Sequence, residues 1–466
     1  MTLFLNDLDI GLDTIEKKNV KICVAGVGTV GLPLATFLAN AGFDVIGLDV
    51  SKDRVDEINS GVVRFEYPDR LKEAIDTNKL KATIDVKESM EDTDVIFTCV
   101  PTPLDDENAI DISNLEDVAN RISPYVKKGM VLVVESSVSI GTTKTMGDLL
   151  EKKSGLKIGT DIGLAYCPER YNPSLPLPKN PPKVVYDDKP SDSHNLTLSG
   201  ISRVVGGIDE KSRKLTKAIY SQIIDASIKE VSSIEAAEAT KLTENIFRDV
   251  NIALVNELAQ VYSKFGLNAY EIIDAAKTKP FAFMAHYPGA GVGGECIPVD
   301  TWYLIKQAEK IGFDTKLLRQ AREVNDYMPH YMIDLLVEEL NNQNISINTS
   351  KITILGVAYK KNIHDYRLSA TFPIVEELNK KGASFVVCDP LIGTIRDRQF
   401  QLTSLSDVFV DSDAILLVTD HDSFSTLELA KIKNEMKHAI IIDGRNFFNE
   451  EKVTSLGFTY RAIGKP

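Results

Sequence analysis

Short apolar runs alternate with helical patterns along the first third of the chain. The runs at 21–25, 44–48, 94–100 and 131–134 have the length and composition of buried strands. Alternation of this kind favours a parallel sheet covered by helices on both faces. The pattern therefore predicts an α/β domain in this part of the chain.

The same alternation begins again after a polar stretch at 341–350. Apolar runs occur at 352–355, 385–387, 414–418 and 440–442. They predict a second doubly wound domain. It is not a sequence repeat of the first, because residues 356–360 lack the glycine-rich turn that follows the first strand.

A long helix is predicted between the two alternating regions. No glycine or proline occurs from Ser233 to Phe265, and Gly266 stands where a helix C-cap would be. The predicted fold is α/β, with two Rossmann-like doubly wound parallel-sheet domains joined by this helix and a helical dimerisation region. The expected domains are residues 1–215, 216–340 and 341–466.

Length and charge narrow the possible functions. A chain of 466 residues is too long for one hydrophobic core. Its net charge of -14 makes nucleic-acid binding unfavourable, because phosphate contacts need a basic surface. A few basic residues in a cleft can still bind an anionic substrate. The proline-rich segment at 173–190 is expected to be an irregular surface loop.

The cysteines and the N-terminal residues indicate a compartment. Five scattered cysteines without CxxC spacing argue against a disulfide framework or a metal site, and for a reducing environment. Residues 1–18 lack the features of a signal peptide, and no run approaches the roughly 20 apolar residues of a membrane span. We therefore expect a cytoplasmic protein with no membrane partner and no metal.

A dinucleotide-binding turn is predicted after the first strand. Residues 26–31 have the GxGxxG pattern, with Gly26, Gly28, Thr29, Val30 and Gly31, and a helical pattern follows. Such glycines bring backbone N–H groups and a helix N-terminus against a pyrophosphate. The alternative is a purely structural turn.

The residue that follows the second strand suggests which dinucleotide binds. Asp49 ends that strand, where a carboxylate binds a ribose 2′-hydroxyl and favours NAD over NADP. The nearby basic residues Lys52 and Arg54 leave NADP open.

Further cofactor contacts are expected where other strands end. Pro101 and Thr102 follow one strand, and Ser137 and Thr142 follow another. Ligands of open α/β sheets gather at the carboxyl ends of strands. For each residue taken singly, ordinary turn or cap chemistry is nearly as good an explanation.

The segment at 289–300 suggests covalent chemistry. Cys296 lies in a loop with Gly289, Gly293 and Gly294, and Asp300 follows four residues later. A thiol beside a nicotinamide can trap an aldehyde as a thiohemiacetal, which loses a second hydride to become a thioester. The alternative, a buried structural cysteine, is disfavoured by the glycines, which fill no core.

Two pairs of polar residues are weaker candidates. Glu169 could orient water or act as a base, and Arg170 could meet a polar sugar group, although a surface ion pair is the better explanation from spacing alone. Lys241 and Asn245 share a face of the predicted long helix and could hold an oxyanion. A solvated helix face is the alternative.

In this order along the chain, the motifs resemble the UDP-glucose/GDP-mannose dehydrogenase family. The resemblance runs roughly from Val20 to the C-terminus and is most similar to the UDP-N-acetylglucosamine 6-dehydrogenase branch. It is carried by the following segments: GxGxxG at 26–31, PTP at 101–103, PER at 168–170, KLTEN at 241–245, AAKTKPF at 275–281, GGxCxPxD at 293–300, Lys360 to Arg367, and DGRN at 443–446.

The resemblance implies roles for these residues. Cys296 would form the thioester, Lys241 and Asp300 would handle the proton and the oxyanion, Asn245 would contact the substrate, and Glu169 would assist hydrolysis. Lys360, Arg367 and Arg445 would reach the nucleotide-sugar, and Gly289, Gly293 and Gly294 would form the loop beneath the sugar. The resemblance also implies NAD as cofactor, a UDP-sugar as substrate and a homodimer.

Three features depart from this branch. Ser174 replaces a glycine commonly found after PER-x-x-P, the proline-rich stretch that follows is longer than expected, and the third lies next to the cysteine. The branch usually has histidine before the cysteine, whereas Glu295 stands here. A negative neighbour raises the pKa of a thiol unless another charge compensates.

The expected function is the four-electron oxidation of a UDP-N-acetylhexosamine at C6, with UDP-N-acetylglucosamine favoured. UDP-N-acetylmannosamine and UDP-glucose are alternative substrates. A single-oxidation hydroxy-acid dehydrogenase and a non-catalytic sensor are the alternative classes.

Overall fold

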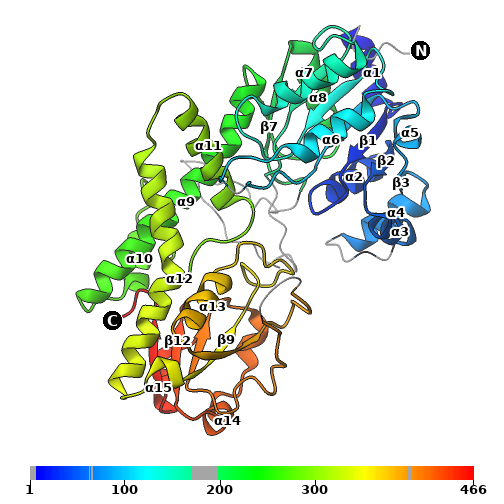
Figure 1. Cartoon of the computed structure of the whole chain (residues 1–466). Coiled ribbons are helices and arrows are strands. Elements are labelled where there is room, and N and C mark those ends of the chain that lie inside the picture. The colour runs from blue at the N-terminus through cyan, green and yellow to red at the C-terminus, as the bar shows by residue number, and fades with distance from the viewer. Residues whose placement is uncertain (1–6, 62, 64–66, 106, 171–197, 396–399) are drawn as a thin grey trace. The chain divides into compact units, whose positions relative to one another are not determined.

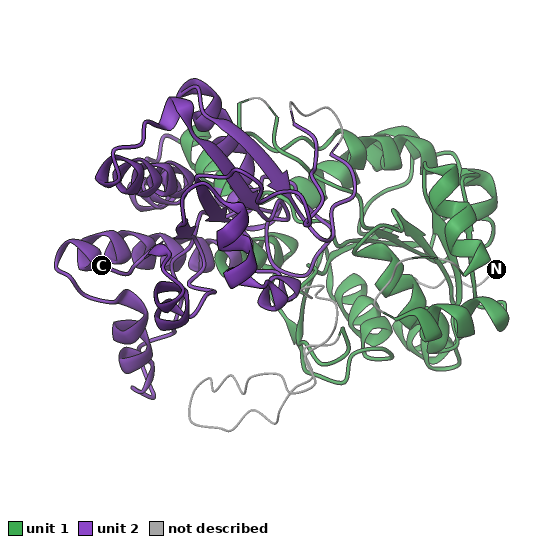
Figure 2. Cartoon of the chain, turned by 90° about the horizontal axis from the view of Figure 1, so that it is seen from below, with its two compact units in different colours: residues 1–244, 302–311 green, residues 245–301, 312–466 purple. Residues whose placement is uncertain are grey.

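The computed structural model describes residues 7–61, 63, 67–105, 107–170, 198–395 and 400–466. The chain divides into two compact units, Met1–Glu244 with Trp302–Ile311 and Asn245–Thr301 with Gly312–Pro466 (Figure 2). Helices α9 (Ile234–Lys264) and α11 (Ile297–Lys310) each contribute residues to both units. The proline-rich segment at 173–190, predicted to be a surface loop, lies outside the described residues.

The first unit contains an eight-stranded sheet with the strand order β3-β2-β1-β4-β5-β6-β7-β8 (Figure 1). All neighbouring strands are parallel except β6 and β7, which are antiparallel. The strands are β1 (Lys21–Ala25), β2 (Asp44–Leu48), β3 (Leu80–Thr83), β4 (Val95–Thr98), β5 (Val131–Val134), β6 (Gly163–Tyr166), β7 (Arg203–Gly207) and β8 (Ile228–Glu230).

Helices cover both faces of this sheet because its strands are apolar on both faces. Ile22 and Val24 of β1 belong to a core that also contains side chains of α2 and α8. Cys23 and Ala25 point to the opposite face, where α6 and α7 supply the core. The helices are α1 (Leu8–Glu16), α2 (Gly31–Asn40), α3 (Lys52–Ser60), α4 (Pro68–Asp76), α5 (Val86–Met90), α6 (Ser113–Ile122), α7 (Thr142–Ser154) and α8 (Glu210–Tyr220).

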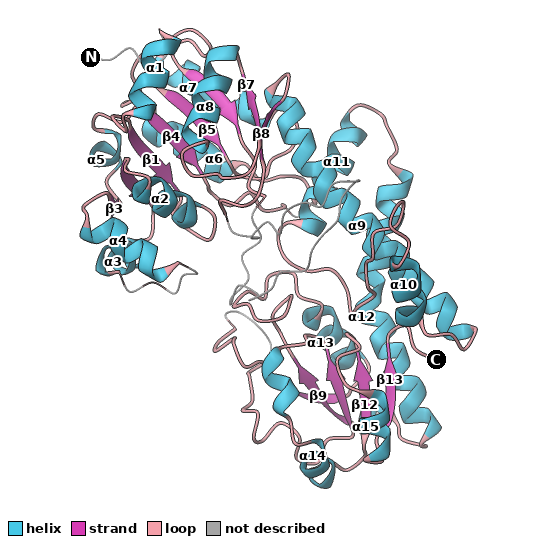
Figure 3. Ribbon diagram, turned by 180° about the vertical axis from the view of Figure 1, so that it is seen from behind, coloured by secondary structure: helices cyan, strands magenta, loops and turns pink. Residues whose placement is uncertain are grey.

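The second unit contains helices and a smaller, fully parallel sheet with the order β10-β9-β11-β12-β13 (Figure 3). Its strands are β9 (Lys351–Leu355), β10 (Ser384–Cys388), β11 (Ala414–Leu417), β12 (Ile440–Asp443) and β13 (Thr459–Ala462). Its helices, besides parts of α9 and α11, are α10 (Ala269–Lys277), α12 (Lys316–Asn342), α13 (Thr371–Lys380), α14 (Leu429–Glu435) and α15 (Glu450–Ser455), with 3-10 turns η1 (Ile347–Thr349) and η2 (Asp422–Thr426).

These elements confirm the predicted α/β fold with two Rossmann-like domains. The long helix predicted from Ser233 to Phe265 is α9, with 31 residues. The antiparallel β7 was not predicted. Among the described residues, no helix is long and apolar enough to cross a membrane. The domain limits 1–215, 216–340 and 341–466 stay a prediction.

An aspartate fixes the first turn of each sheet in the same way. Asp49 follows β2, and its Oδ2 accepts a hydrogen bond from the N–H of Val27 in the turn after β1, at 3.1 Å. Asp389 follows β10, and its Oδ2 accepts from the N–H groups of Val357 and Ala358 after β9, at 2.6 and 2.9 Å. The two domains therefore share a structural feature that their sequences do not show.

The carboxylate of Asp389 is kept in its ionised form by its contacts within the fold. Burial acts to raise the pKa of Asp389, but bonds from His421 and from the N–H of Ala358 outweigh burial and lower it to about 2. An unfolded aspartate has a pKa of about 3.9. The carboxylate therefore stabilises the fold above about pH 4, and this stabilisation is lost as the pH falls toward 2.

We expect Asp389→Asn to lower the free energy of unfolding at pH 7 by about 2–3 kcal/mol. The substitution places an amide where several N–H donors converge on a buried acceptor. Urea unfolding followed by circular dichroism measures the change, with the exposed Asp407→Asn as control. An unchanged midpoint for Asp389→Asn would contradict this account of the turn.

Candidate functional site

The candidate residues form two sets, one in each compact unit. Lys241 lies in the first unit and Asn245 in the second, one turn apart on the continuous helix α9. Glu169 and the predicted cofactor residues share the first unit with Lys241. Cys296, Asp300 and the predicted substrate residues at 289–294 and 360–445 share the second unit with Asn245.

The glycine turn after β1 shows which glycines the fold itself requires. A Cβ at Gly31 would lie 1.9 Å from the carbonyl oxygen of Gly26, and a Cβ at Gly26 would lie 2.7 Å from that of Cys99. A Cβ at Gly28 would meet nothing within 4 Å. Gly28 and Thr29 are exposed, and Val30 is the N-cap residue of α2. The turn thus leaves open the position where a pyrophosphate would approach backbone N–H groups.

Asp49 and Arg54 hold this turn from the neighbouring strand and helix. Besides the bond to Val27, Asp49 accepts from the N–H of Ser51 at 3.0 Å. Arg54 Nε donates to the carbonyl of Val27 at 3.0 Å. Asp49 is thereby fixed at the carboxyl end of β2. Its contact with a ribose, and that of Arg54 with the cofactor, stay predictions.

The structure brings together the loops that follow β4 and β5. Thr102 Oγ1 donates to the carbonyl of Ser137 at 2.6 Å, and Asn114 Nδ2 donates to that of Pro101 at 3.0 Å. Two residues of α11 hold these loops: the hydroxyl of Tyr303 donates to the carbonyl of Thr102, and the Gln307 amide exchanges two hydrogen bonds with Ile140. Sequence reasoning missed Tyr303 and Gln307 because they lie 201 and 167 residues from the residues they contact.

The N-terminus of α7 is occupied by a side chain of α9. Glu238 is fully buried, and its carboxylate accepts from the N–H groups of Gly141 and Thr143 at 2.6 and 2.9 Å. Thr142, predicted to contact the cofactor, lies 3.0 Å from Ser139 through their hydroxyl oxygens. These contacts are cap chemistry, the alternative explanation for Thr142 from the sequence. A cofactor contact for Ser137 and Thr142 stays a prediction.

Glu169 and Lys241 belong to one cluster of buried charged residues. Lys241 Nζ donates to the backbone carbonyl of Glu169. The Glu169 carboxylate lies 3.3 Å from Nη1 of Arg203, which is 1% exposed. Arg203 was not predicted as a site residue. A single arginine at the start of the apolar strand β7 is the sequence feature that could have identified it. Its charge compensates the buried Glu169.

A second carboxylate, Glu135, lies deeper in this cluster. It is fully buried, accepts a hydrogen bond from the Tyr220 hydroxyl and lies 4.0 Å from Arg203. Burial raises the pKa of Glu135 to about 7, against the attraction of Arg203. Burial also raises the pKa of the neighbouring thiols of Cys99 and Cys167. These two cysteines are therefore held as thiols and are poor nucleophiles.

Arg170 forms an ion pair, which the sequence favoured over a substrate contact. Its Nε and Nη2 lie 3.1 and 2.7 Å from the carboxylate oxygens of Glu244 on α9. Its Nη1 donates to the carbonyl of Ser202 at 2.6 Å. A substrate contact of Arg170 stays a prediction.

In the second unit, Asn245 and Asp300 form a buried pair close to Cys296. Asn245 Nδ2 donates to Oδ2 of Asp300 at 2.6 Å, and both residues are at most 6% exposed. The N–H of Asp300 donates to the carbonyl of Cys296 at 2.9 Å, which places Cys296 at the start of α11. A helix N-terminus lowers the pKa of a thiol. No disulfide joins any of the five cysteines, and Cys296 is the one that is exposed.

The glycine loop packs tightly against predicted substrate residues. The N–H of Gly289 donates to Oδ1 of Asn256 on α9 at 3.0 Å, and a Cβ at Gly289 would lie 2.6 Å from Nη1 of Arg445. A Cβ at Gly293 would lie 2.5 Å from the carbonyl oxygen of Leu368, and one at Gly294 would lie 2.8 Å from the Tyr359 ring. The glycines therefore allow the cysteine loop to contact loops at the carboxyl ends of β9 and β12.

The loop after β9 carries the other predicted substrate residues. Lys360 is half-buried beside Tyr359. The Arg367 guanidinium contacts the carboxylate of Asp365 through Nε and Nη2, and that of Glu295 through Nη1. Glu295, the position that departs from the family pattern, thus has a cationic partner.

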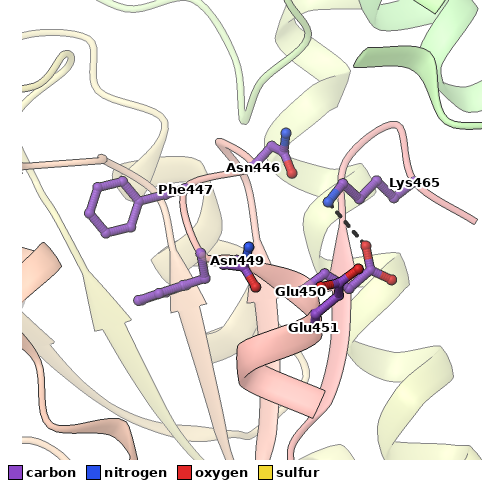
Figure 4. A pocket seen from close by; sticks show the side chains of 7 residues that line it. Asn446, Phe447, Asn449, Glu450, Glu451 and Lys465 are labelled. Atoms are coloured by element: carbon purple, nitrogen blue, oxygen red, sulfur yellow. Dashed lines mark hydrogen bonds and ion pairs between the residues drawn. The ribbon is translucent and has the colours of Figure 1, made fainter. Parts of the chain in front are cut away.

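An open hollow of about 520 Å³ lies on the loop after β12 (Figure 4). Asn446, Phe447 and Asn449 line one part of it. In another part, Lys465 Nζ lies 3.0 Å from Glu450. Arg445 is not among its lining residues, and its Nε donates instead to the carbonyl of Val418 at 2.9 Å. The hollow is therefore not where the predicted substrate residues converge.

A dinucleotide-binding turn in one domain and an exposed cysteine beside a second Rossmann-like domain are the features of a nucleotide-sugar dehydrogenase. The chain belongs to the UDP-glucose/GDP-mannose dehydrogenase family of NAD-dependent enzymes. The match covers the NAD binding domain at residues 20–224, the central domain at 235–327 and the UDP binding domain at 353–450.

Relatives place the chain in the UDP-N-acetylhexosamine branch of nucleotide-sugar dehydrogenases. It is 34% identical to a UDP-N-acetyl-D-mannosamine dehydrogenase of Methanococcus vannielii over 97% of this chain and 99% of the relative. It is 31% identical to a UDP-N-acetyl-D-glucosamine 6-dehydrogenase of Pseudomonas aeruginosa, over 93% and 99%. The solved structure of a UDP-D-ManNAc dehydrogenase from Pyrococcus horikoshii superposes with a TM-score of 0.84 at 35% identity, over 96% and 99%.

We expect Gly28→Ala to weaken NAD binding about tenfold while leaving the melting temperature unchanged. The added methyl enters open space, so it disturbs the approach of a ligand and not the fold. Calorimetric titration with NAD and thermal unfolding measure the two effects. Gly393→Ala, which also adds a methyl to open space, is the matched control. Equal NAD affinity in both variants would contradict the assignment of the turn.

Proposed function

We propose that this enzyme oxidises the C6 hydroxyl of a UDP-N-acetylhexosamine to the carboxylate, with two NAD consumed per sugar. The observation that carries the proposal is Cys296, an exposed cysteine at the start of α11 whose loop packs on the UDP-binding domain. A nucleophile in this place is needed to retain the aldehyde between the two oxidations.

The chemistry divides into two oxidations and a hydrolysis. NAD, when bound, accepts one hydride in each oxidation. In the first, C6 loses a hydride and its hydroxyl a proton, which leaves an aldehyde. The Cys296 thiolate adds to this carbonyl, and the oxyanion takes up a proton to give a thiohemiacetal. The thiohemiacetal then loses the second hydride and its hydroxyl proton to become a thioester. Water then cleaves the C–S bond, which releases the carboxylate and returns the thiol.

The buried polar residues would serve these steps. Asn245 holds Asp300, whose carboxylate would take a proton one helical turn from Cys296. The Lys241 ammonium would stabilise the oxyanion, and Glu169 would orient the hydrolytic water. Arg170, Lys360, Arg367 and Arg445, with the loop of Gly289, Gly293 and Gly294, would contact the nucleotide-sugar.

UDP-N-acetylmannosamine is the substrate that we place first. Several relatives at 33–36% identity are UDP-N-acetyl-D-mannosamine dehydrogenases, and the glucosamine enzyme of Pseudomonas aeruginosa is 31% identical. This support reverses the order favoured by the sequence motifs, which put UDP-N-acetylglucosamine first. Comparison of kcat/KM for these two sugars and for UDP-glucose decides between them.

We expect two NADH per sugar when either acetamido sugar is limiting, and no uronate from Cys296→Ser. A serine cannot form the thioester, so the second oxidation stops. NADH absorbance and mass spectrometry of the product measure both results, with the buried Cys388→Ala as control. Uronate formation by Cys296→Ser at the wild-type rate would exclude the thioester route. One NADH per sugar in the wild type would instead indicate a single-oxidation dehydrogenase, and NAD binding without NADH formation would indicate a sensor.

We also propose that the chain forms a homodimer through the outer face of α9. Phe247, Leu254 and Val261 repeat every seven residues and therefore share one face of the helix. They are 48%, 52% and 40% exposed, so a long helix presents apolar side chains to solvent. A face of this kind is typical of a protein–protein interface.

We expect Leu254→Asp to convert the dimer to a monomer at micromolar concentration. A carboxylate in the centre of the apolar face opposes its burial against a second copy. Sedimentation velocity measures the mass in solution. Ile10→Asp, at an equally exposed apolar position on α1, is the matched control. A wild-type monomer, or a Leu254→Asp dimer of unchanged strength, would refute this interface.

A further inference from the structure

Three charged residues form a cluster beside the candidate nucleophile, here called the Arg367 cluster: Glu295, Asp365 and Arg367. Arg367 Nε lies 2.9 and 3.1 Å from the two oxygens of Asp365, and its Nη2 lies 2.6 Å from Oδ2. Its Nη1 donates to Oε2 of Glu295. One guanidinium therefore bridges two carboxylates, one from its own loop and one from the cysteine loop.

Backbone contacts hold the two loops together at the same point. The N–H of Gly294 donates to the carbonyl of Arg367 at 3.0 Å. Gly293 and Gly294 pack without side chains against Leu368 and Tyr359. The position of Glu295 is therefore determined by the Arg367 loop through both its backbone and its charge, and Cys296 is the next residue along the chain.

Glu295 creates an electrostatic problem for Cys296. A carboxylate next to a thiol raises the thiol pKa and reduces the thiolate present at neutral pH. Asp365 and Asp300 add negative charge from the loop after β9 and from α11. Burial and the nearby carboxylate of Asp365 raise the pKa of Tyr359 to about 12, so its phenol stays neutral. Arg367 is the cationic residue of the second unit that forms an ion pair with Glu295.

We propose that Arg367 is a positioning residue that binds the Glu295 carboxylate and thereby keeps the Cys296 thiolate available for reaction. The inference rests on the proposed function, in which Cys296 is the nucleophile. A guanidinium carries more N–H donors than these contacts use, so the pairing leaves capacity for a substrate contact. Without Arg367, the carboxylates of Glu295 and Asp365 would both lie uncompensated beside Cys296.

The pH dependence of Cys296 alkylation by iodoacetamide tests this proposal. Only the exposed cysteine reacts rapidly, since the other four are buried, and intact mass spectrometry counts one adduct. The whole protein is used without cofactor or sugar. We expect Arg367→Gln to raise the apparent thiol pKa by about one unit, which slows labelling about tenfold below that pKa. Arg367→Lys retains the charge and should stay within about threefold of the wild type.

The double variant separates the charge pair from a general effect on the fold. Glu295→Gln alone should label at least as fast as the wild type, and Glu295→Gln with Arg367→Gln should recover most of the rate lost in Arg367→Gln. Lys361→Gln removes a cation of the same loop that pairs with Asp422 and should change nothing.

Two results would overturn the proposal. One is labelling of Arg367→Gln at the wild-type rate over the whole pH range. The other is equally slow labelling of the single Arg367→Gln and the double variant. If Arg367→Gln does not fold, slower labelling of Glu295→Gln alone is the contrary result. Because alkylation needs no turnover, these results are independent of whether Cys296→Ser abolishes uronate formation.

Discussion

The arrangement of the candidate site depends on one buried polar stripe along helix α9. Glu238, Lys241, Asn245, Asp249 and Asn256 recur at helical spacing, and each is at most 8% exposed. Each of four members contacts a different segment: Glu238 holds the start of α7, Lys241 the backbone of Glu169, Asn245 the carboxylate of Asp300, and Asn256 the loop at Gly289. Within each unit, α9 therefore holds loops that lie far apart in the sequence: the start of α7 and Glu169 in the first unit, and Asp300 and the loop at Gly289 in the second.

Burial of this stripe explains why polar side chains of α9 face the protein interior while apolar side chains face solvent. A buried polar group without a partner costs about 1–3 kcal/mol, so each member must find a partner in a loop or helix that packs on α9. Asp249, for example, accepts from Arg322 and Asn325 of α12 at 2.7 and 2.8 Å. The opposite face carries Phe247, Leu254 and Val261, which need no hydrogen-bond partner and remain exposed. The inner face of the helix carries the residues proposed for catalysis, and the outer face carries the apolar side chains of the proposed dimer interface.

Local pattern was enough to predict eight strands (β1, β2, β4, β5 and β9 to β12) and α9, because apolar runs and the absence of glycine and proline are properties of short segments. It was not enough for α12, which continues through Pro329 although proline normally ends a helix. The contacts of Arg203 with Glu135 and Glu169, and of Arg367 with Glu295, depend on residues more than thirty positions apart. Sequence reasoning identified Glu169, Arg170 and Arg367 as charged candidates, but only tertiary structure shows that each has an internal partner.

The two Rossmann-like domains use the same anchored turn for different purposes. In the first, Asp49 fixes a turn that is open at Gly28, so a ligand can approach the backbone. In the second, a Cβ at Gly356 would lie 2.4 Å from Cβ of Thr419, and the Thr419 hydroxyl donates to the carbonyl of Ala358 at 2.6 Å, so the protein itself fills the turn. The chain after this filled turn is free to extend as the loop that carries Tyr359 and Arg367 to the cysteine loop. The second turn thus lacks the open backbone found at Gly28, and the loop that follows it contacts the cysteine loop instead.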